Sequence, residues 1–205
     1  MEMNKEMIYS IVLAVVMAVG IVLTFIIKPT KDPAKLRGRV SRVLNKFAAP
    51  RKFRVLDHVT IEGKDGLCTI DHVLVGWFGI LFVNDLLLEG DYTGNLIEGD
   101  WICTKTNRQD ERDVTRLGRV ENPLVAAREF EAAARALLTT NKVACPAMES
   151  VVVTAYNKGK FFITGSKDLV FNLRTLRSYL SLSAWIQKDA KADVERICNV
   201  LSGKA

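Results

Sequence analysis

Three acidic side chains crowd one short stretch of the sequence, Val83 to Asn95, which reads VNDLLLEGDYTGN. Asp85, Glu89 and Asp91 follow directly on a strand-like apolar run. Carboxylate oxygens are the ligands that Mg²⁺ takes in proteins, and bound Mg²⁺ activates water for hydrolysis. Glu89 and Asp91 are therefore candidate metal ligands, provided that their loop folds back over the edge of a sheet. The alternative is that Glu-Gly-Asp before tyrosine is an ordinary turn.

Other kinds of active site have few residues to draw on. The only two histidines, His58 and His72, both fall in strand-like segments. The four cysteines form no close pair and have no histidine at the spacing of a zinc site, so we expect reduced packing residues. They are Cys68, Cys103, Cys145 and Cys198. The sequence gives no indication of a nucleotide-binding loop or a redox cofactor.

Alternating and continuous apolar runs predict the strands that must position the acids. Residues 53–61 and 67–76 predict a hairpin around the turn EGKDG, and residues 78–83 predict a third, buried strand. Residues 95–105 predict a further hairpin or edge strand. The segment 106–120, rich in both charge signs, predicts a surface loop. MESVVVTAY, KFFIT and DLVF return to strand later in the chain.

Four amphipathic segments are expected in the sequence, each with a recognisable start or apolar face. Asp32 and Pro33 predict the start of the first, and Asn122 and Pro123 that of the second. Asn172 begins another, and the last surrounds residues 194–201. Together these elements predict an α/β (α+β) fold in which helices flank one central sheet.

An uncharged apolar run precedes the domain. Residues 7–27 read MIYSIVLAVVMAVGIVLTFII, which at about 1.5 Å per residue crosses a hydrocarbon core of roughly 30 Å. A cleaved signal peptide is the alternative, but its apolar region is shorter, about 7 to 15 residues. We therefore expect one transmembrane helix at 7–27 after a short N-terminus at 1–6.

Basic residues follow the apolar run and set the expected orientation. Residues 1–27 carry a net charge of −1, residues 28–54 carry +9, and the rest carries −2, within a total of +6. The positive-inside bias predicts a single-pass cell-membrane protein with its N-terminus outside and its domain in the cytoplasm. A basic cluster at this place is expected to contact anionic lipid, through Lys28, Lys31, Lys35, Arg39, Arg42 and Lys46. The near-neutral domain gives only weak support for a nucleic-acid partner.

A larger pattern of motifs runs through residues 36–123. It comprises a helix with Gly38, the Ile-Asp-His strand at 70–72, and the glycine-led strand FGILFV. It continues with Tyr-x-Gly at 92–94, Trp101, and the Asn-Pro helix start at Asn122. In these residues the chain resembles the nuclease-related domain, NERD, of the restriction-endonuclease-like superfamily. The resemblance implies a central mixed sheet flanked by helices, in a domain that we place at 51–205 after a basic linker and helix at 28–50.

The resemblance also implies a chemistry, metal-assisted hydrolysis of phosphodiester bonds. In that superfamily an Asp on one strand and a Glu on the next hold Mg²⁺, and a Lys two residues after the Glu positions the nucleophile. Asp71 matches the strand aspartate, and its alternative role is a plain hydrogen-bonding acid at a strand edge. The candidate catalytic residues are Asp71, from the resemblance, with Glu89 and Asp91 as replacement acids nearby in the sequence, and if the protein is active Asp71 and Asp91 are the expected metal ligands.

The chain departs from this pattern at the other positions. Aligned on GILFV, Asn84 and Leu86 replace the Glu and the Lys, and aligned on the Tyr-x-Gly turn, Leu88 and Gly90 replace them. On the leading helix the family's Gly-Glu reads Gly38-Arg39, and an arginine repels a metal ion. Lys105 is a distant candidate for the basic role.

Three functions follow from these observations. The first is a membrane-anchored nuclease-like domain that has lost catalysis and serves as a binding or interaction module. The second is an active Mg²⁺-dependent nuclease with relocated acids. The third is a structural membrane protein that binds anionic lipid and oligomerises, and a protein partner is compatible with the first and third.

Overall fold

The computed structural model describes most of the chain beyond Lys31. The described residues are 9, 13, 15–17, 32–97, 99–107, 113–145, 147–156, 159–165, 169–182, 185 and 192–204. The chain divides into two compact units, Met1–Asp32 and Pro33–Ala205. Within the described part, no helix combines the length and apolar composition needed to cross a membrane. Most of the predicted span at 7–27 lies outside the described residues, so the anchor stays a prediction.

The second unit begins with a helix, as the Asp32-Pro33 pair predicts. Helix α2 (Pro33–Ala48) leads through the short helix η1 (Ala49–Arg51) into the hairpin of β1 (Arg54–Gly63) and β2 (Gly66–Gly76). Strand β3 (Gly79–Leu86) pairs antiparallel with β2. Strand β7 (Met148–Thr154) pairs parallel with β3, and β9 (Val170–Asn172) pairs parallel with β7. The result is a mixed five-stranded sheet in the order β1-β2-β3-β7-β9, called sheet A below.

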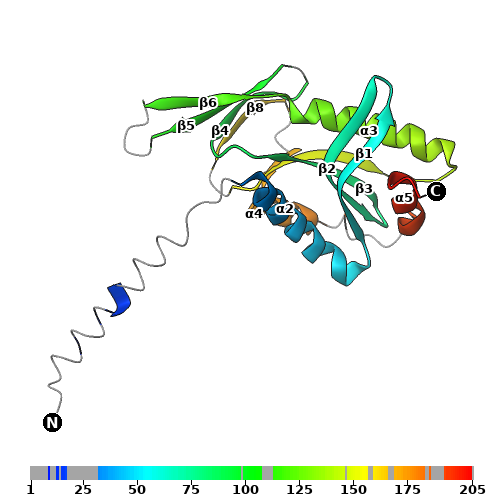
Figure 1. Cartoon of the computed structure of the whole chain (residues 1–205), viewed down its shortest axis with the longest axis horizontal. Coiled ribbons are helices and arrows are strands. Elements are labelled where there is room, and N and C mark those ends of the chain that lie inside the picture. Colours follow the sequence, from blue (N-terminus) through cyan, green and yellow to red (C-terminus); the bar gives the residue numbers. More distant parts are fainter. Residues whose placement is uncertain are drawn as a thin grey trace, which may run out of the picture. The chain divides into compact units, whose positions relative to one another are not determined.

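Helices cover both faces of sheet A (Figure 1). Helix α2 and helix α4 (Leu173–Leu180) pack on one face, against Leu74, Leu81 and Val83. Helix α3 (Pro123–Thr140) and helix α5 (Val194–Leu201) pack on the other face, against Ile80 and Phe82. The apolar spacing of the helices therefore serves two separate cores, one on each side of the sheet.

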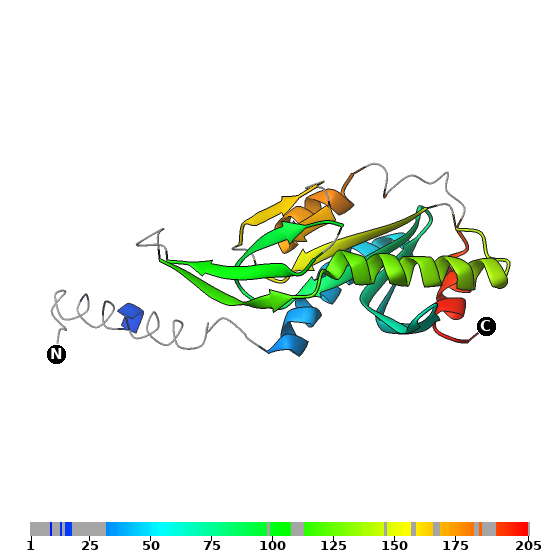
Figure 2. The ribbon, with the colours of Figure 1, turned by 90° about the horizontal axis from the view of Figure 1, so that it is seen from above.

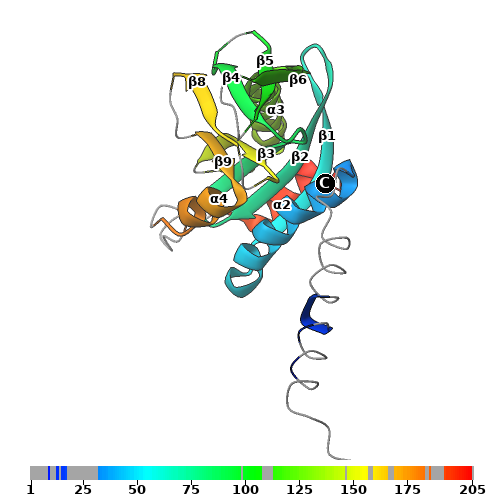
Figure 3. The same ribbon diagram turned by 90° about the vertical axis from the view of Figure 1, so that its left-hand side faces the viewer.

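A second sheet, sheet B, lies beside the first (Figure 3). It contains β4 (Asp91–Asn95), β5 (Trp101–Thr106), β6 (Val114–Val120) and β8 (Phe161–Thr164), in the order β6-β5-β4-β8. Strands β4 and β8 pair parallel and the other pairs are antiparallel, so sheet B is also mixed. Its buried side forms a third core with Leu124 at the start of α3 and with Leu86.

Several expectations are confirmed and three are corrected. The 53–61/67–76 hairpin, the helix starts at Pro33 and Pro123, and the packing of α2 on the sheet are all present. The expected single sheet is wrong, because strands β4, β5, β6 and β8 form a sheet of their own. The loop expected at 106–120 contains strand β6. Its side chains are mostly exposed, so buried and exposed residues do not alternate along it as in most strands. Helix α2 also belongs to the compact domain, which starts at Pro33 and not at residue 51.

A buried acid and histidine network between three sheet strands and helix α2

Asp71 lies on β2 and both of its carboxylate oxygens have partners. Arg37 of α2 donates from Nε to Oδ1 at 2.8 Å, and the backbone N–H of Asp85 on β3 donates to Oδ2 at 2.9 Å. The Asp71 side chain is 16% exposed and that of Arg37 is 34% exposed. Arg37 thus places a guanidinium cation against the acid that the family resemblance singles out.

His72, the next residue, lies between two further carboxylates. Its Nδ1 is 2.6 Å from Oδ1 of Asp57 on β1, and its Nε2 is 3.0 Å from Oδ2 of Asp85. The His72 and Asp85 side chains are buried, whereas Asp57 is half exposed. Each of the two hydrogen bonds needs a proton, and an imidazolium supplies both. A neutral histidine beside a protonated Asp85 supplies the same two protons, so the arrangement fits either form.

The titration of this pair reflects its burial. Burial raises the pKa of Asp85 to about 6, the Asp71 charge adds to the rise, and His72 opposes it. Burial alone would lower the pKa of His72, but the hydrogen bonds and charges of Asp85 and Asp57 outweigh it and raise that pKa. The second oxygen of Asp85, Oδ1, is buried and has no hydrogen-bond partner among the described residues. A buried acceptor in that state favours a protonated or shared-proton carboxyl over a free carboxylate.

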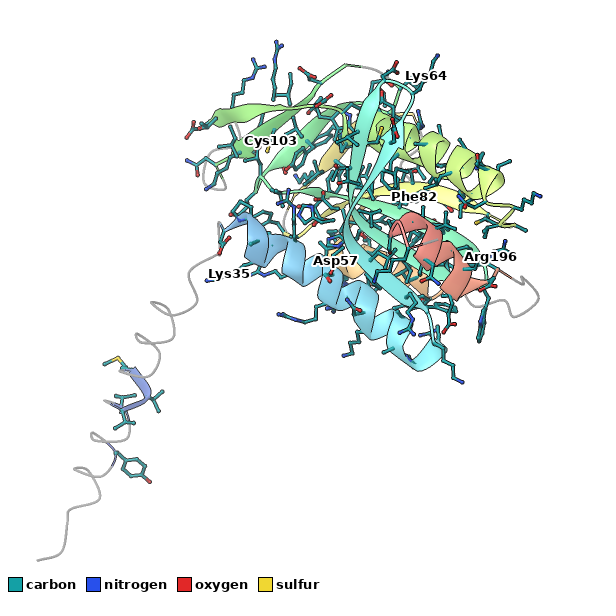
Figure 4. The ribbon with its side chains drawn as sticks, turned by 45° about the vertical axis from the view of Figure 1, so that its right-hand side comes forward. Lys35, Asp57, Lys64, Phe82, Cys103 and Arg196 are labelled. Atoms are coloured by element: carbon teal, nitrogen blue, oxygen red, sulfur yellow. The ribbon has the colours of Figure 1, made fainter. Side chains whose placement is uncertain are left out.

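Three polar side chains on one side of α2 extend this hydrogen-bond network. Arg37, Ser41 and Asn45 are four residues apart and so lie on one side of the helix. Ser41 donates from Oγ to Oδ2 of Asp57 at 2.7 Å, and Asn45 donates to the Ser41 carbonyl at 2.9 Å. Figure 4 shows Asp57 on β1 beside the middle of α2. The network therefore connects Asp85, in the interior, to the half-exposed Asp57 at the edge strand.

The other two predicted acids lie elsewhere. Asp91 begins β4 in sheet B, where Thr106 donates to Oδ2 at 3.0 Å and the backbone N–H of Lys160 donates to Oδ1 at 2.8 Å. Glu89 is half-buried. It lies near Tyr156, whose pKa is raised mainly by burial and further by the charge of Glu89. Lys105 is exposed on β5. Both oxygens of Asp91 thus stabilise the start of sheet B, and neither contacts Asp71.

The sequence contained a signal for Asp85 that our interpretation missed. In an extended strand Leu81, Val83 and Asp85 point to one face, and Phe82, Asn84 and Leu86 point to the other. Because we ended the strand at Val83, Asp85 was assigned to the following loop. Asp57 and Arg37 carry no comparable signal, since their contacts depend on the β1–β2 register and on how α2 lies across the sheet.

The comparison with protein families agrees with the motif pattern. The model of the nuclease-related domain, NERD, matches residues 35–155, more than half of the chain. The chain belongs to the NERD family. Neither the curated proteins nor the solved structures gave a match.

Several residues of the NERD motif pattern have structural roles in sheet B. Trp101 packs against Gly94 so closely that a Cβ there would lie 2.4 Å from its ring, and its Nε1 donates to the Asn95 carbonyl at 2.8 Å. Asn122 caps α3 by accepting from the Leu124 amide, and it donates to the same Asn95 carbonyl. Tyr92 is buried and donates to a carbonyl of the preceding loop. These matches therefore account for how sheet B is attached to α3.

The residues that replace the second acid and the lysine in the alignment on GILFV do not face Asp71. Asn84 points to the α3 side and donates to the Pro123 carbonyl at 2.8 Å, and Leu86 is buried in the third core. Asp85 is the β3 acid that faces Asp71 and His72. Two residues after Asp85 is Leu87, half-buried against the α2–α4 core, so this third alignment also lacks the lysine.

The residues around Asp71 do not fit a Mg²⁺ site. A guanidinium nitrogen lies 2.8 Å from one Asp71 oxygen, and the neighbouring Asp85 carboxyl is bonded to His72. No three His, Cys, Asp or Glu side chains of the described chain come together as ligands. We expected Arg39 to be the arginine that disfavours a metal. That expectation named the wrong arginine, because Arg37 forms the ion pair with Asp71 and Arg39 lies near Tyr156.

Proposed function

We propose that this protein is a membrane-anchored NERD domain that does not hydrolyse phosphodiester bonds and acts as a binding or interaction module. The observation that carries the proposal is that both carboxylate oxygens of Asp71 are already hydrogen-bonded. One accepts from Arg37 and the other from the Asp85 amide. Metal-assisted hydrolysis needs open coordination positions on converging carboxylates. The two oxygens of Asp71 are already bonded, and the neighbouring Asp85 carboxyl is bonded to His72 through Oδ2.

The chemistry of the neighbouring residues supports the same proposal. Leu87 stands where a nuclease would hold its lysine, and an apolar side chain neither orients a nucleophile nor stabilises a developing negative charge. His72 is held by carboxylates on both ring nitrogens, so it has no free nitrogen to accept a proton from water. What this site can do is stabilise the packing of α2 on sheet A.

An active Mg²⁺-dependent nuclease is the second candidate. The buried and unpartnered Oδ1 of Asp85, adjacent to Asp71, favours it, because such an atom is a ready ligand. Catalysis would require Arg37 to leave Asp71 and His72 to release Asp85. The ion pair and the hydrogen bond must both break before a metal can bind.

A cleavage assay separates the two candidates. The full chain, purified in lipid nanodiscs, is incubated with labelled single-stranded DNA, double-stranded DNA and RNA in Mg²⁺ or Mn²⁺. Asp71→Asn is the test variant, and Asp65→Asn, in the exposed β1–β2 turn, is the matched control. We expect the wild type to cleave no faster than Asp71→Asn. Cleavage that Asp71→Asn abolishes and Asp65→Asn retains would establish the nuclease instead.

The membrane anchor is proposed on the sequence of residues 7–27, which contains no charged side chain over a length that spans a bilayer. It implies a single-pass protein whose domain lies on the side favoured by the basic residues at 28–54. Extraction tests it directly. The full chain should stay with membranes in high salt and in alkaline carbonate, and should dissolve only in detergent.

A further inference from the structure

Helices α2 and α4 form a layer that contains cations and no acids. The two helices pack on each other on the same face of sheet A, and neither sequence contains Asp or Glu. Residues 33–54 carry a net charge of +8, and residues 55–205 carry −2 even with the two arginines of α4. The cations of the layer are Lys35, Arg37, Arg39, Arg42 and Lys46 from α2, and Arg174 and Arg177 from α4.

Most of these cations face solvent. Arg37 is bonded to Asp71, but Lys35, Arg42 and Lys46 are exposed, and so are both arginines of α4. The α4 arginines are about 130 residues from α2 in the sequence. Only the fold brings the two groups together, as Figure 2 and Figure 3 show for the adjacent ribbons. The exposed positive charge is therefore a property of the folded layer and not of one basic segment.

Hollows on this layer place cations around an apolar floor. One, of about 260 Å³, lies between the helices and is lined by Val43, Lys46, Phe47, Arg177 and Leu180. A second, of about 730 Å³, extends along α4 from Asn172 to Arg177. Lys46 and Arg177 thus come from opposite sides to one apolar recess. Such a recess suits a phosphate whose attached group is itself apolar.

We propose that the α2–α4 layer docks on the headgroups of an anionic phospholipid bilayer, with Lys46 and Arg177 binding lipid phosphates. The proposal rests on the membrane anchor proposed above, because it assigns the face of the domain that meets the same membrane. The apolar run ends at Ile27, and only five residues separate it from Pro33. Five residues reach at most about 18 Å, so the start of α2 cannot lie far from the lipid surface.

A single-stranded nucleic acid would offer the same phosphate charge, but proteins that bind single strands also stack the bases on aromatic side chains. Bases stack on free aromatic faces. Phe47, the aromatic residue of the recess, has the Arg51 guanidinium 4.2 Å above its ring and the Phe53 ring 6.0 Å away. The layer therefore fits a lipid surface better than an unstacked base.

Lysine labelling in nanodiscs tests the docking on the intact chain. The full chain is reconstituted in neutral nanodiscs and in nanodiscs that contain phosphatidylserine, and the rate of acetylation is measured at each lysine. Lys35 and Lys46 should react about fivefold more slowly in the anionic discs, the factor that corresponds to roughly 1 kcal/mol per lysine. Lys64, in the β1–β2 turn, should react equally in both, and high salt should abolish the difference.

A charge-reversal pair identifies the residues. Lys46→Glu with Arg177→Glu should remove the protection of Lys35, whereas Lys64→Glu with Arg116→Glu, at exposed positions outside the layer, should leave it intact. Equal labelling of Lys35 and Lys46 in neutral and anionic discs would overturn the docking. Protection by added oligonucleotide in neutral discs, without protection by anionic lipid, would also overturn it. Failure of the chain to enter nanodiscs at all would instead refute the anchor.

Discussion

Arg37 donates from Nε to the Asp71 carboxylate at 2.8 Å, across the boundary between helix α2 and strand β2. This one contact gives the strand aspartate of a nuclease-related fold a structural partner. It neutralises the charge that a metal ion would neutralise in a nuclease. On the same side of α2, Ser41 donates to Asp57, so side chains of this helix bond to both β1 and β2.

Replacement of Arg37 by alanine should destabilise the domain. The substitution leaves Asp71 mostly buried with one oxygen unpartnered, and the lost charged hydrogen bond should lower the free energy of unfolding by about 1–3 kcal/mol. Arg42→Ala, at an exposed position of the same helix, should change it by less than about 0.5 kcal/mol. Urea unfolding of both variants measures the difference. Equal midpoints would show that the ion pair contributes nothing to stability.

The same variant should change metal binding. Without the guanidinium, the partly exposed Asp71 carboxylate lies unpaired beside the buried Asp85 carboxyl, and carboxylates are the ligands of Mg²⁺ and Mn²⁺. We expect the wild type to bind no Mn²⁺ at millimolar concentration by calorimetry, and Arg37→Ala to bind it weakly. Wild-type binding that Asp71→Asn removes would contradict our assignment of Arg37.

Stability should fall as the pH rises from about 4. The pKa of Asp85 is about 6 in the fold against an ordinary 3.8, so between these values the folded chain binds more protons than the unfolded chain. The difference corresponds to about 3 kcal/mol, lost as the pH rises to 6. The pKa of His72 is raised above 6.5, so its contribution is present below pH 6.5 and is lost as the pH rises through the folded value.

Asp85→Asn removes the Asp85 titration together with the Asp85 contribution to the raised pKa of His72. The variant keeps the shape of the side chain but cannot titrate, whereas Asp57, Asp71 and Arg37 are unchanged. The wild type should lose stability relative to Asp85→Asn between pH 4 and 7, measured by urea unfolding across that range. Parallel pH profiles for the two proteins would exclude a shared proton between Asp85 and His72.

Two glycines should respond to alanine in opposite directions. Gly79 begins β3 with a φ of +127°, and a Cβ there would lie 2.0 Å from the Ala147 carbonyl oxygen, which accepts from the Ile80 amide. Gly79→Ala should cost more than about 3 kcal/mol. Gly38 is exposed in α2 with no atom within 4 Å of the added Cβ, so Gly38→Ala should gain about 1 kcal/mol. Thermal unfolding distinguishes the two directions.

Two asparagine caps should differ in their effect. Asn122 is buried, caps α3 and also donates to the Asn95 carbonyl in sheet B. Asn172 caps α4 through an exposed capping box. Asn172→Ala should cost about 1 kcal/mol, and Asn122→Ala should cost roughly twice that because it removes both the cap of a buried helix start and the hydrogen bond to the Asn95 carbonyl. Similar losses would show that the link to sheet B contributes little.

Local patterns in the sequence sufficed for most elements of the domain. Helix α3 begins at Asn122-Pro123 because a cap and a proline act within one turn, and the β1–β2 hairpin follows from alternation around a polar turn. Strand β6 was missed for a physical reason. It is an edge strand with mostly exposed side chains, so burial does not mark its residues as a strand.

The sequence by itself determined that the chain is a NERD protein with Asp71 on a strand and with no acid-x-lysine motif in the next strand and loop, residues 78–95. It could not determine which acids meet, because contacts between β1, β2, β3 and α2 join residues that are far apart in the chain. Only the tertiary structure placed Arg37 on Asp71, His72 between Asp57 and Asp85, and Asp91 in a different sheet. A shift of one residue in strand register reverses the face of every side chain. The chemistry of this site therefore depends on packing that local sequence does not encode.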